Sequence, residues 1–215
     1  MNKEKENKRL GGWQMWVELN EDYVIKTPKV RKEIEKNVRK YLKWIGKPEE
    51  LKLRVDRAIK DVHKSLYIIN RSKIPKRYLA YPEFLENGKI KQKRVKVVNE
   101  ELYRLIDLKR KKEVYKLIDE SIKFFMFLWK YGIHEKTYKI TSNFGVDGNQ
   151  IVLIDFLELE GNKKKVEKQL RKKSWYMYKQ MAKNYPKEVI DYYMKKADEN
   201  FTISNLNKYW KNNKL

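Results

Sequence analysis

The stretch that decides the fold is "FGVDGNQIVLIDF", residues 144–156. It reads as a strand, a tight turn at Asp147-Gly148-Asn149 and a second strand. The second strand, Ile151 to Ile154, is a continuous aliphatic run of the kind that is buried on both faces. It ends at Asp155, and a carboxylate at the end of a buried strand must be paired, hydrogen-bonded or bound to a metal ion. Asp155 is therefore either a metal ligand or a turn residue that accepts backbone N–H bonds, and only the first indicates an enzyme.

The composition indicates an ordered and strongly basic protein. The chain has 215 residues, which is enough for one large domain or two small lobes around a core. Its 52 Lys and Arg residues outnumber 29 Asp and Glu residues and give a formal net charge of +23. Such a charge attracts nucleic acid, nucleotide phosphates or acidic partners, although a lysine-rich proteome would produce the same excess.

Several classes of protein are disfavoured by what the sequence lacks. There is no cysteine, so disulfides, a thiolate zinc site and a cysteine nucleophile are excluded. The two histidines, His63 and His134, do not favour a zinc site. No apolar stretch approaches the ~20 residues of a membrane span. The charged start of the chain also lacks the apolar region of a signal peptide, so we expect a cytoplasmic protein without a membrane partner.

The first half of the chain alternates short strands with helices. Strands are predicted by β-branched and aromatic runs, and helices by apolar residues that recur every three or four positions. Thr27-Pro28 has the chemistry of a helix start, and Asn87-Gly88 is a two-residue hairpin signal. The predicted elements are a flexible basic tail (1–9), strands at 16–19 and 23–25, helices at 27–45 and 48–70, and a hairpin within 78–97.

The second half is predominantly helical. A strand hairpin at 142–156 joins two helical blocks, which is not how a helical bundle is built, and the order favours an α+β fold. Glycine at 132 and at 161 ends the preceding elements. The other predicted elements are a helix at 99–131, helices at 163–184 and 186–199, and a short last helix capped by Thr202 or Ser204.

Three pieces of the chain, in this order, resemble the protein kinase-like superfamily. "RLGGWQMWVEL", residues 9–19, lies where the glycine-rich loop belongs. "YVIK", residues 23–26, is similar to the family's strand motif that ends in lysine. "TSNFGVDGNQIVLIDF", residues 141–156, resembles the end of the catalytic loop, the following hairpin and the metal-binding Asp-Phe-Gly. The resemblance covers roughly residues 10–160.

The resemblance implies a two-lobed kinase-like fold that binds ATP and Mg²⁺ between the lobes. A small antiparallel sheet with helices would form an N-lobe (10–98), and a helical C-lobe (99–215) would contain the hairpin. Lysine would neutralise the nucleotide phosphates, one glutamate of the next helix would hold that lysine, and hard oxygen ligands would hold Mg²⁺. The implied site residues are Gly11, Gly12, Lys26, Glu33 and Glu35 around the nucleotide, Asn143 and Asp155 on the metal ion, and Lys26 and Asp155 in catalysis.

The sequence departs from the family pattern in the phosphate loop and at the catalytic base. The two glycines are adjacent rather than spaced, and Leu157 replaces the glycine after Asp-Phe. The family places an Asp five residues before the metal-binding Asn, but this position holds Tyr138, which is no base near neutral pH. Glu135 is our candidate replacement, and His134 is either an acid or base or a structural residue. Two nearby lysines are candidate phosphate contacts, Lys136 and Lys139.

Two function classes remain open. The first is an ATP- and Mg²⁺-binding atypical serine/threonine-type protein kinase or pseudokinase, for which we expect weak or specialised phosphoryl transfer, with a protein as one possible acceptor. The second is a non-catalytic basic protein that binds nucleic acid through clusters at 89–94 and 162–173. The charge is common to both. The hairpin from Asn143 to Asp155 favours the first, because a simple nucleic-acid binder has no use for it. Asn143 as an ordinary turn residue and Lys26 as a surface lysine are the structural alternatives.

Overall fold

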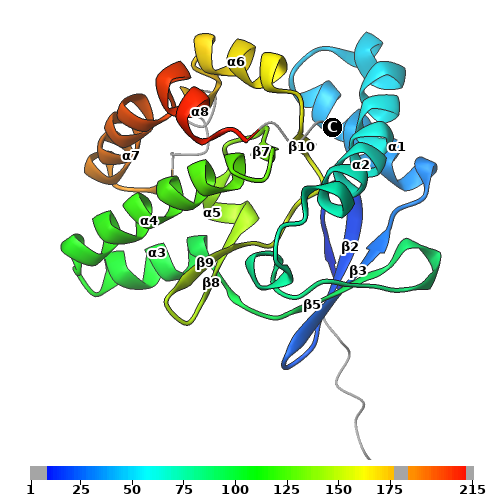
Figure 1. Cartoon of the computed structure of the whole chain (residues 1–215). Helices are drawn as coiled ribbons and strands as arrows, with labels where there is room; N and C mark the ends of the chain where they lie inside the picture. The colour runs from blue at the N-terminus through cyan, green and yellow to red at the C-terminus, as the bar shows by residue number, and fades with distance from the viewer. Residues whose placement is uncertain (1–8, 177–183, 212–215) are drawn as a thin grey trace, which may run out of the picture.

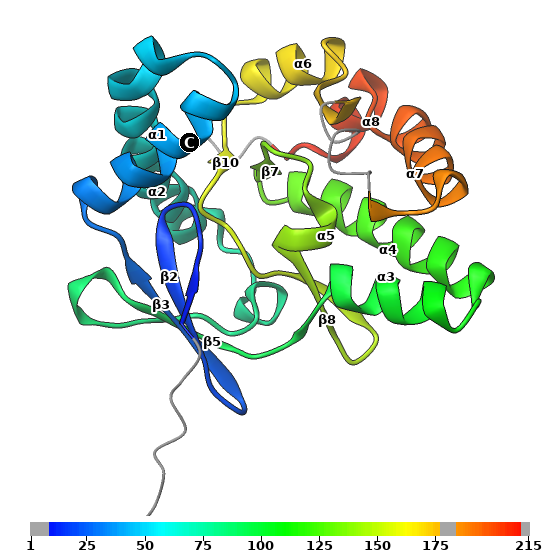
Figure 2. The same cartoon turned by 180° about the vertical axis from the view of Figure 1, so that it is seen from behind.

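The computed structural model of the chain describes residues 9–176 and 184–211. Its elements form an α+β fold with a sheet and two helices on one side and most of the remaining helices on the other (Figures 1 and 2). Residues 1–8 of the predicted tail lie outside the described ranges, whereas Arg9 already begins the first strand. Within those ranges no helix combines the length and the apolar character needed to cross a membrane.

A five-stranded antiparallel sheet forms the β-rich side of the molecule. Its central strand pairs Lys26 with Val17 on one neighbour and with Ile90 on the other. The hairpin predicted within 78–97 is confirmed and spans 83–93, with Asn87 and Gly88 both at positive φ in the turn. In spatial order the strands are β1 (Arg9–Gly11), β2 (Met15–Leu19), β3 (Tyr23–Pro28), β5 (Ile90–Lys93) and β4 (Glu83–Phe84).

Two helices, α1 (Arg31–Trp44) and α2 (Leu51–Ser72), pack against each other beside this sheet (Figures 1 and 2). Their contact is a separate apolar cluster that includes Val38 and Val55. The predicted helix start at Thr27-Pro28 is wrong, because both residues belong to β3 and Pro28 lies opposite Met15. Strand pairing outweighs the local capping chemistry there, and the helix begins only at Arg31.

The other side of the molecule is built around one long buried helix, α4. It carries ten buried residues, and α3, α7 and α8 all contact it. The helices are α3 (Val98–Asp107), α4 (Lys111–Trp129), α5 (Ile140–Asn143), α6 (Lys163–Arg171), α7 (Lys187–Asn200) and α8 (Ile203–Tyr209). Thr202, rather than Ser204, caps α8 by accepting a hydrogen bond from the Asn205 backbone N–H at 3.1 Å.

Two further small sheets lie between these helices. The hairpin prediction is confirmed, because β8 and β9 pair with each other and Gly148 has a positive φ of 59° in the turn. Gly145 is required at its position, since a Cβ atom there would lie 2.5 Å from a methyl group of Val95. The strands are β6 (Lys96–Val97), β8 (Phe144–Asp147) and β9 (Gln150–Leu153) in one sheet, and β7 (His134–Glu135) with β10 (Leu159–Glu160) in the other.

The predicted helix at 99–131 is two helices. It is interrupted between Asp107 and Lys111, where Lys109 adopts a left-handed backbone conformation with φ 56°. This break lets the chain reverse, so that the apolar face of α3 and the start of α4 contribute to the same core. Periodicity alone cannot reveal such a break, because the apolar pattern continues on both sides of it.

The predicted helix at 163–184 ends early, at Arg171. Lys173 has a positive φ of 47°, and the chain then turns to bury Trp175, whose ring is 2% exposed. The indole N–H of Trp175 donates to a carboxylate oxygen of Asp198 at 3.1 Å. Burial of this large ring outweighs continuation of the helix. Residues 177–183 of the predicted helix lie outside the described ranges.

The main core is continuous across the molecule. It joins Met15, Ile68 and Ile90 from the β-rich side to the apolar faces of the helical side. Its centre is aromatic, with Phe125 in ring contact with both Tyr138 and Phe144. Tyr138 belongs to the loop from His134 to Asn143, and Phe144 belongs to the hairpin, so both segments are anchored in this aromatic centre. It therefore fixes the backbone of the segments that carry most of the candidate site residues.

Candidate functional site

Lys26 of β3 reaches across the molecule to the end of the hairpin. Its ammonium donates to the backbone carbonyl of Ile154 at 2.5 Å, although the two residues are 128 positions apart. Lys26 is only 9% exposed. Burial lowers the pKa of the Lys26 ammonium, and the nearby negative charge of Asp155 acts in the opposite direction. Lys26 is therefore not a surface lysine, and its ammonium lies at the end of the hairpin in the electrostatic field of Asp155.

The hairpin brings Asn143 and Asp155 together through the backbone. The carbonyl of Asn143 accepts hydrogen bonds from the N–H groups of Ile154 at 2.9 Å and of Asp155 at 3.1 Å. Asp155 also accepts a bond from the Leu157 N–H, but at 3.4 Å this contact is weak. The Asp155 carboxylate therefore accepts only this one weak hydrogen bond among the described residues, and its other lone pairs could coordinate a cation.

The Asn143 side chain is held in one orientation. Its amide nitrogen donates to Glu135 and to Thr137, both at 3.2 Å, while its amide oxygen accepts from Ser142 at 3.1 Å. Asn143 is therefore a fixed residue of the loop, and these bonds fit a structural turn residue as well as a metal ligand. Its amide oxygen and the Asp155 carboxylate are the kind of hard oxygen donors that Mg²⁺ prefers.

Glu135, the predicted base, is enclosed by the loop it belongs to. The side chain is 1% exposed and accepts hydrogen bonds from the backbone and hydroxyl of Thr137, the backbone of Lys139 and the amide of Asn143. Burial raises the pKa of Glu135 to about 7, although the Thr137 bonds act to lower it. Both oxygens of the Glu135 carboxylate already accept hydrogen bonds and are closed to solvent, so this side chain organises the loop. A substrate hydroxyl cannot reach it in this conformation.

His134 and Tyr138 are structural residues of the aromatic core. His134 is fully buried, and its Nδ1 atom accepts from the indole N–H of Trp129 at 3.1 Å. Burial lowers the pKa of His134 to about 3, so the ring is neutral. Burial and the charge of Glu135 raise the pKa of Tyr138, which is also fully buried. Of the two roles left open for His134, the structure supports the structural one.

The two candidate phosphate lysines differ in availability. Lys136 forms an ion pair with Asp61 of α2 at 2.7 Å, and both side chains are mostly buried. Lys139 has no acidic partner within 4 Å in the described part of the chain, and its charge acts on both Glu135 and Glu158. Lys139 is therefore the more available cation of the pair.

Asp61 and Glu158 are site carboxylates that the sequence did not indicate. Glu158 follows the hairpin, and its backbone carbonyl accepts from the Lys136 N–H at 3.0 Å. Burial raises the pKa of Glu158; the Lys139 and Lys136 charges oppose this shift, while Asp155 and Asp61 add to it. No hydrogen bond or ion pair holds the Glu158 carboxylate among the described residues. Asp61 lies 35 positions after Lys26 in the sequence. Its place in the site could be predicted only if the packing of α2 were already known.

The predicted partners of Lys26 on the first helix are wrong. Glu35 pairs with Arg39 on the exposed side of α1 at 2.5 Å. Glu33 accepts from the indole N–H of Trp16 and from the Val30 N–H, both at 2.9 Å. The helix begins too soon after β3 for either carboxylate to face the lysine, and Asp155 is the charge that acts on Lys26.

The two glycines form a tight turn between β1 and β2. The Gly12 N–H donates to the Met15 carbonyl at 2.9 Å, and a Cβ atom on Gly12 would lie 2.9 Å from that same oxygen. The Gly12 carbonyl accepts from the Lys29 ammonium at 2.5 Å. The turn is thus closed and anchored to the start of α1. No hydrogen bond joins this turn to Lys26 or Asp155 in the described ranges, so its predicted phosphate role stays a prediction.

Comparisons with known proteins add no assignment to this geometry. Neither the protein-family models nor the curated proteins nor the solved structures contain a match to this chain. The described residues also hold no group of three or more His, Cys, Asp or Glu side chains placed to bind a metal ion. A cation site here would therefore rest on one carboxylate, one amide oxygen and ligands from a bound nucleotide.

Proposed function

We propose that this chain is an ATP- and Mg²⁺-binding protein of kinase-like architecture that performs phosphoryl transfer. The observation that carries the proposal is the contact of Lys26 with the Ile154 carbonyl, which joins the central strand of the sheet to the end of the hairpin. A buried ammonium beside a carboxylate, where two sides of the molecule meet, is suited to a nucleotide triphosphate and its metal ion.

The arrangement of elements supports the two-lobed architecture. An antiparallel sheet with α1 and α2 would be the N-lobe, and the helices around α4 with the β8–β9 hairpin would be the C-lobe (Figures 1 and 2). β1 to β5 share one sheet, as a single N-lobe requires, whereas Lys96–Val97 at the end of the predicted N-lobe (10–98) pair with β8 of the hairpin. Lys26 and Asp155 then come from different lobes and meet between them.

Each polar residue has a distinct task in this proposal. Lys26 and Lys139 neutralise phosphate oxygens as point charges. Asp155 and the amide oxygen of Asn143 are the residues that would hold Mg²⁺, which when bound neutralises the charge of the phosphates. Glu135 is a positioning residue, because it fixes the Asn143 amide and the Lys139 backbone by hydrogen bonds.

Glu158 is the carboxylate best placed to accept the proton of the acceptor hydroxyl. Glu135 is enclosed and Asp61 is paired with Lys136, whereas the Glu158 carboxylate has no partner within the described ranges. The negative charge of Asp155 acts on the Glu158 carboxyl and helps to raise its pKa, so Glu158 lies near the proposed metal ligand. This replaces the sequence-based choice of Glu135 as base.

Lys26→Ala should weaken ATP binding about tenfold or more, with or without Mg²⁺, because a charged donor to phosphate is lost. The measurement is the shift of the thermal unfolding midpoint over an ATP titration. Lys91→Ala, on the adjacent strand β5 with a half-exposed side chain, is the matched control. A wild-type protein that ATP does not stabilise, or equal ATP affinity in wild type and Lys26→Ala, would overturn the proposed function.

Glu158→Gln should lower turnover by about a hundredfold and leave ATP affinity nearly unchanged, since general base help is typically worth ~10²–10⁴. Glu135→Gln should instead raise the Mg²⁺ concentration needed for binding, because it loosens Asn143. The assay is transfer or hydrolysis of the ATP γ-phosphate. The reverse pattern would restore Glu135 as base, and turnover no greater than background in the wild type would make the protein a pseudokinase.

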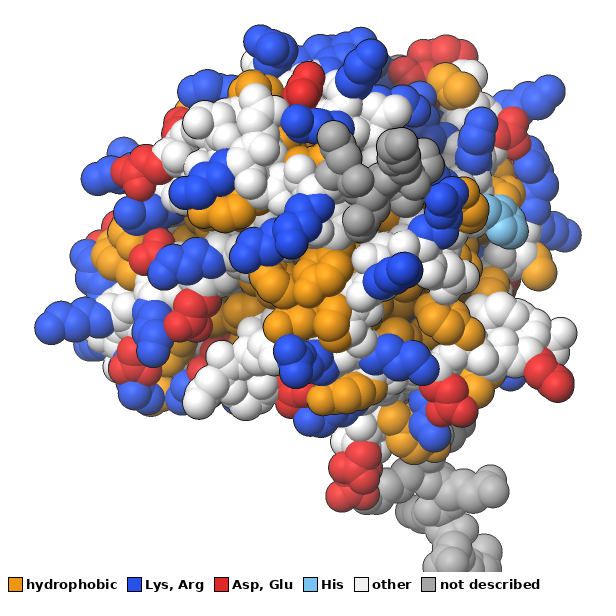
Figure 3. Space-filling view, in the orientation of Figure 1, with side chains coloured by type: hydrophobic (Ala, Val, Ile, Leu, Met, Phe, Trp, Pro, Cys, Tyr) orange, Lys and Arg blue, Asp and Glu red, His pale blue; other side chains and the backbone are white. Residues whose placement is uncertain are grey.

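Non-catalytic nucleic-acid binding is the second candidate function. The surface in Figure 3 carries Lys and Arg side chains over all of the visible face, without gathering them into one stripe. Several of them pair with nearby acids, as Lys93 does with Asp147 at 2.6 Å. The net charge alone therefore points to no particular binding face, and the observation that favours a basic site is a single pocket on α2 and α6.

A further inference from the structure

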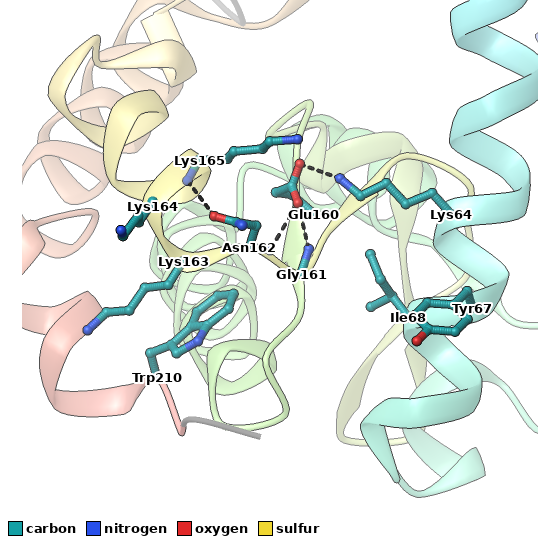
Figure 4. Close-up of a pocket in the computed structure, with 10 residues that line it drawn as sticks. All are labelled: Lys64, Tyr67, Ile68, Glu160, Gly161, Asn162, Lys163, Lys164, Lys165 and Trp210. Atoms are coloured by element: carbon teal, nitrogen blue, oxygen red, sulfur yellow. Dashed lines mark hydrogen bonds and ion pairs between the residues drawn. The ribbon is translucent and has the colours of Figure 1, made fainter. Parts of the chain in front are cut away.

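A pocket of about 500 Å³ opens between α2, the start of α6 with the segment that joins it to β10, and Trp210 at the end of α8 (Figure 4). Its rim is cationic, with Lys64 from α2 on one side and three consecutive lysines of α6 on the other. Its floor is apolar, because Ile68 and the Trp210 ring line it. The members of this lysine pocket are Lys64, Tyr67, Ile68, Glu160, Gly161, Asn162, Lys163, Lys164, Lys165 and Trp210.

The one acid in the lysine pocket is already satisfied. Glu160 accepts from the Lys64 ammonium at 2.5 Å and from the N–H groups of Gly161 and Asn162 at 3.0 and 2.9 Å. Burial works against its ionisation, but these partners outweigh burial and hold the pKa of Glu160 below its ordinary value. Glu160 is thus an ionised anchor for the pocket wall. Its charge pairs with Lys64 and acts on Lys165, and it leaves Lys163 and Lys164 without an acid in the pocket.

Lys163, Lys164 and Lys165 form no ion pair within 4 Å among the described residues, and only Lys165 is acted on by the charge of Glu160. They occupy the first turn of α6, which contains no acid. Like charges on adjacent residues repel, and cations in a first turn also oppose the helix dipole. The lysine pocket therefore holds an excess positive charge that an anionic ligand would relieve.

The apolar side chains of the pocket narrow the choice of ligand class further. Tyr67 is 55% exposed at the opposite edge from Lys163, while Trp210 and Ile68 are mostly covered and form the floor (Figure 4). An exposed ring on one side of a pocket and a group of lysines on the other suit a ligand that carries both an aromatic ring and a phosphate. We propose that the lysine pocket binds a nucleotide unit, with its phosphate on Lys163–Lys165 and its base against Tyr67. This inference is independent of the proposed ATP site, since it uses none of the same residues.

The test is fluorescence anisotropy with a labelled ten-nucleotide single-stranded RNA at ~50 mM salt, where phosphate contacts are strong. The triple variant Lys163→Gln, Lys164→Gln, Lys165→Gln should bind at least tenfold more weakly than wild type. The matched control is Lys32→Gln, Lys36→Gln, Lys43→Gln on the exposed face of α1, which removes the same charge and should change affinity by less than threefold. The pocket variant should also lower the slope of log K against log salt by about 2. Equal losses in both variants, or no RNA binding by wild type, would overturn the proposal.

Competition by AMP and by inorganic phosphate separates the sources of the nucleotide. Displacement of the RNA by AMP would mean that one free nucleotide suffices, whereas displacement only by unlabelled RNA would mean that the ligand is a strand. Tyr67→Ala should weaken RNA and AMP about fivefold and leave the effect of inorganic phosphate unchanged. Because Tyr67 is exposed, this variant should fold normally, and unchanged RNA binding by it would overturn the assignment of a base to the pocket. Lys26→Ala should bind the RNA as wild type does, which keeps failure here distinct from failure at the ATP site.

Discussion

Asp155→Ala is expected to abolish the Mg²⁺-dependent part of ATP stabilisation and to reduce γ-phosphate transfer to background. A ligand at a hundred times its dissociation constant stabilises the folded state by about 2.7 kcal/mol. The hairpin holds the Asp155 carboxylate next to Asn143, because the N–H groups of Ile154 and Asp155 both donate to the Asn143 carbonyl. Without the Asp155 carboxylate, the Asn143 amide oxygen would be the single protein ligand, and Mg²⁺ would remain hydrated.

The control for this substitution comes from the other end of the same hairpin. Asp147 ion-pairs with the exposed Lys93 at 2.6 Å, so Asp147→Ala removes a carboxylate and a surface ion pair without touching the site. Thermal unfolding is measured for the three proteins with ATP, with and without Mg²⁺. Identical Mg²⁺ responses in wild type and Asp155→Ala would refute the metal role of Asp155. They would leave the role of Lys26 to its own test.

The elements with local signals were predictable from the sequence. The β8–β9 hairpin needs a left-handed residue in its turn, and Gly148 in "DGN" provides it. The end of α1 near Gly46 and the start of the next helix after Pro48 follow from the same kind of chemistry. Predictions failed where tertiary packing outweighed a local signal. Pairing of Pro28 with Met15 extended β3 through a helix-start motif, and burial of Trp175 ended α6 early.

The site was predictable only where one segment carries several of its residues. Asn143 and Asp155 lie on one hairpin, so their proximity follows from the turn between them. Asp61 and Glu158 could not be predicted, because their places depend on how α2 packs against β10 and the β7 loop. The sequence indicated Glu135 only as a candidate base, whereas its hydrogen bond to Asn143 and its enclosure by four donors are properties of the folded loop.

His134 and Glu135 are adjacent buried groups whose titrations should oppose each other. Burial lowers the pKa of His134 to about 3 and raises the pKa of Glu135 to about 7. In the unfolded chain their ordinary pKa values are about 6.5 and about 4.5. Between pH 4.5 and 6.5 the unfolded chain therefore carries a protonated histidine and an ionised glutamate, while the folded chain carries both groups neutral. Each state binds one proton on the pair, so the pair contributes almost no pH dependence to stability in this window.

When either group is removed, the free energy of unfolding should depend on pH through the titration of the remaining group. In Glu135→Gln only His134 remains, and its lowered pKa means that stability is lost as pH falls from 6.5 towards 3, by up to roughly 5 kcal/mol in total. In His134→Gln only Glu135 remains, and its raised pKa means that stability is lost as pH rises from 4.5 towards 7, by up to roughly 3 kcal/mol. Urea unfolding at pH 4.5, 5.5 and 6.5 in the presence of EDTA measures both slopes against the wild type. Opposite signs are expected; slopes equal to that of wild type in both variants would mean that neither group is buried as described, and the loop that holds Asn143 would have to be built differently.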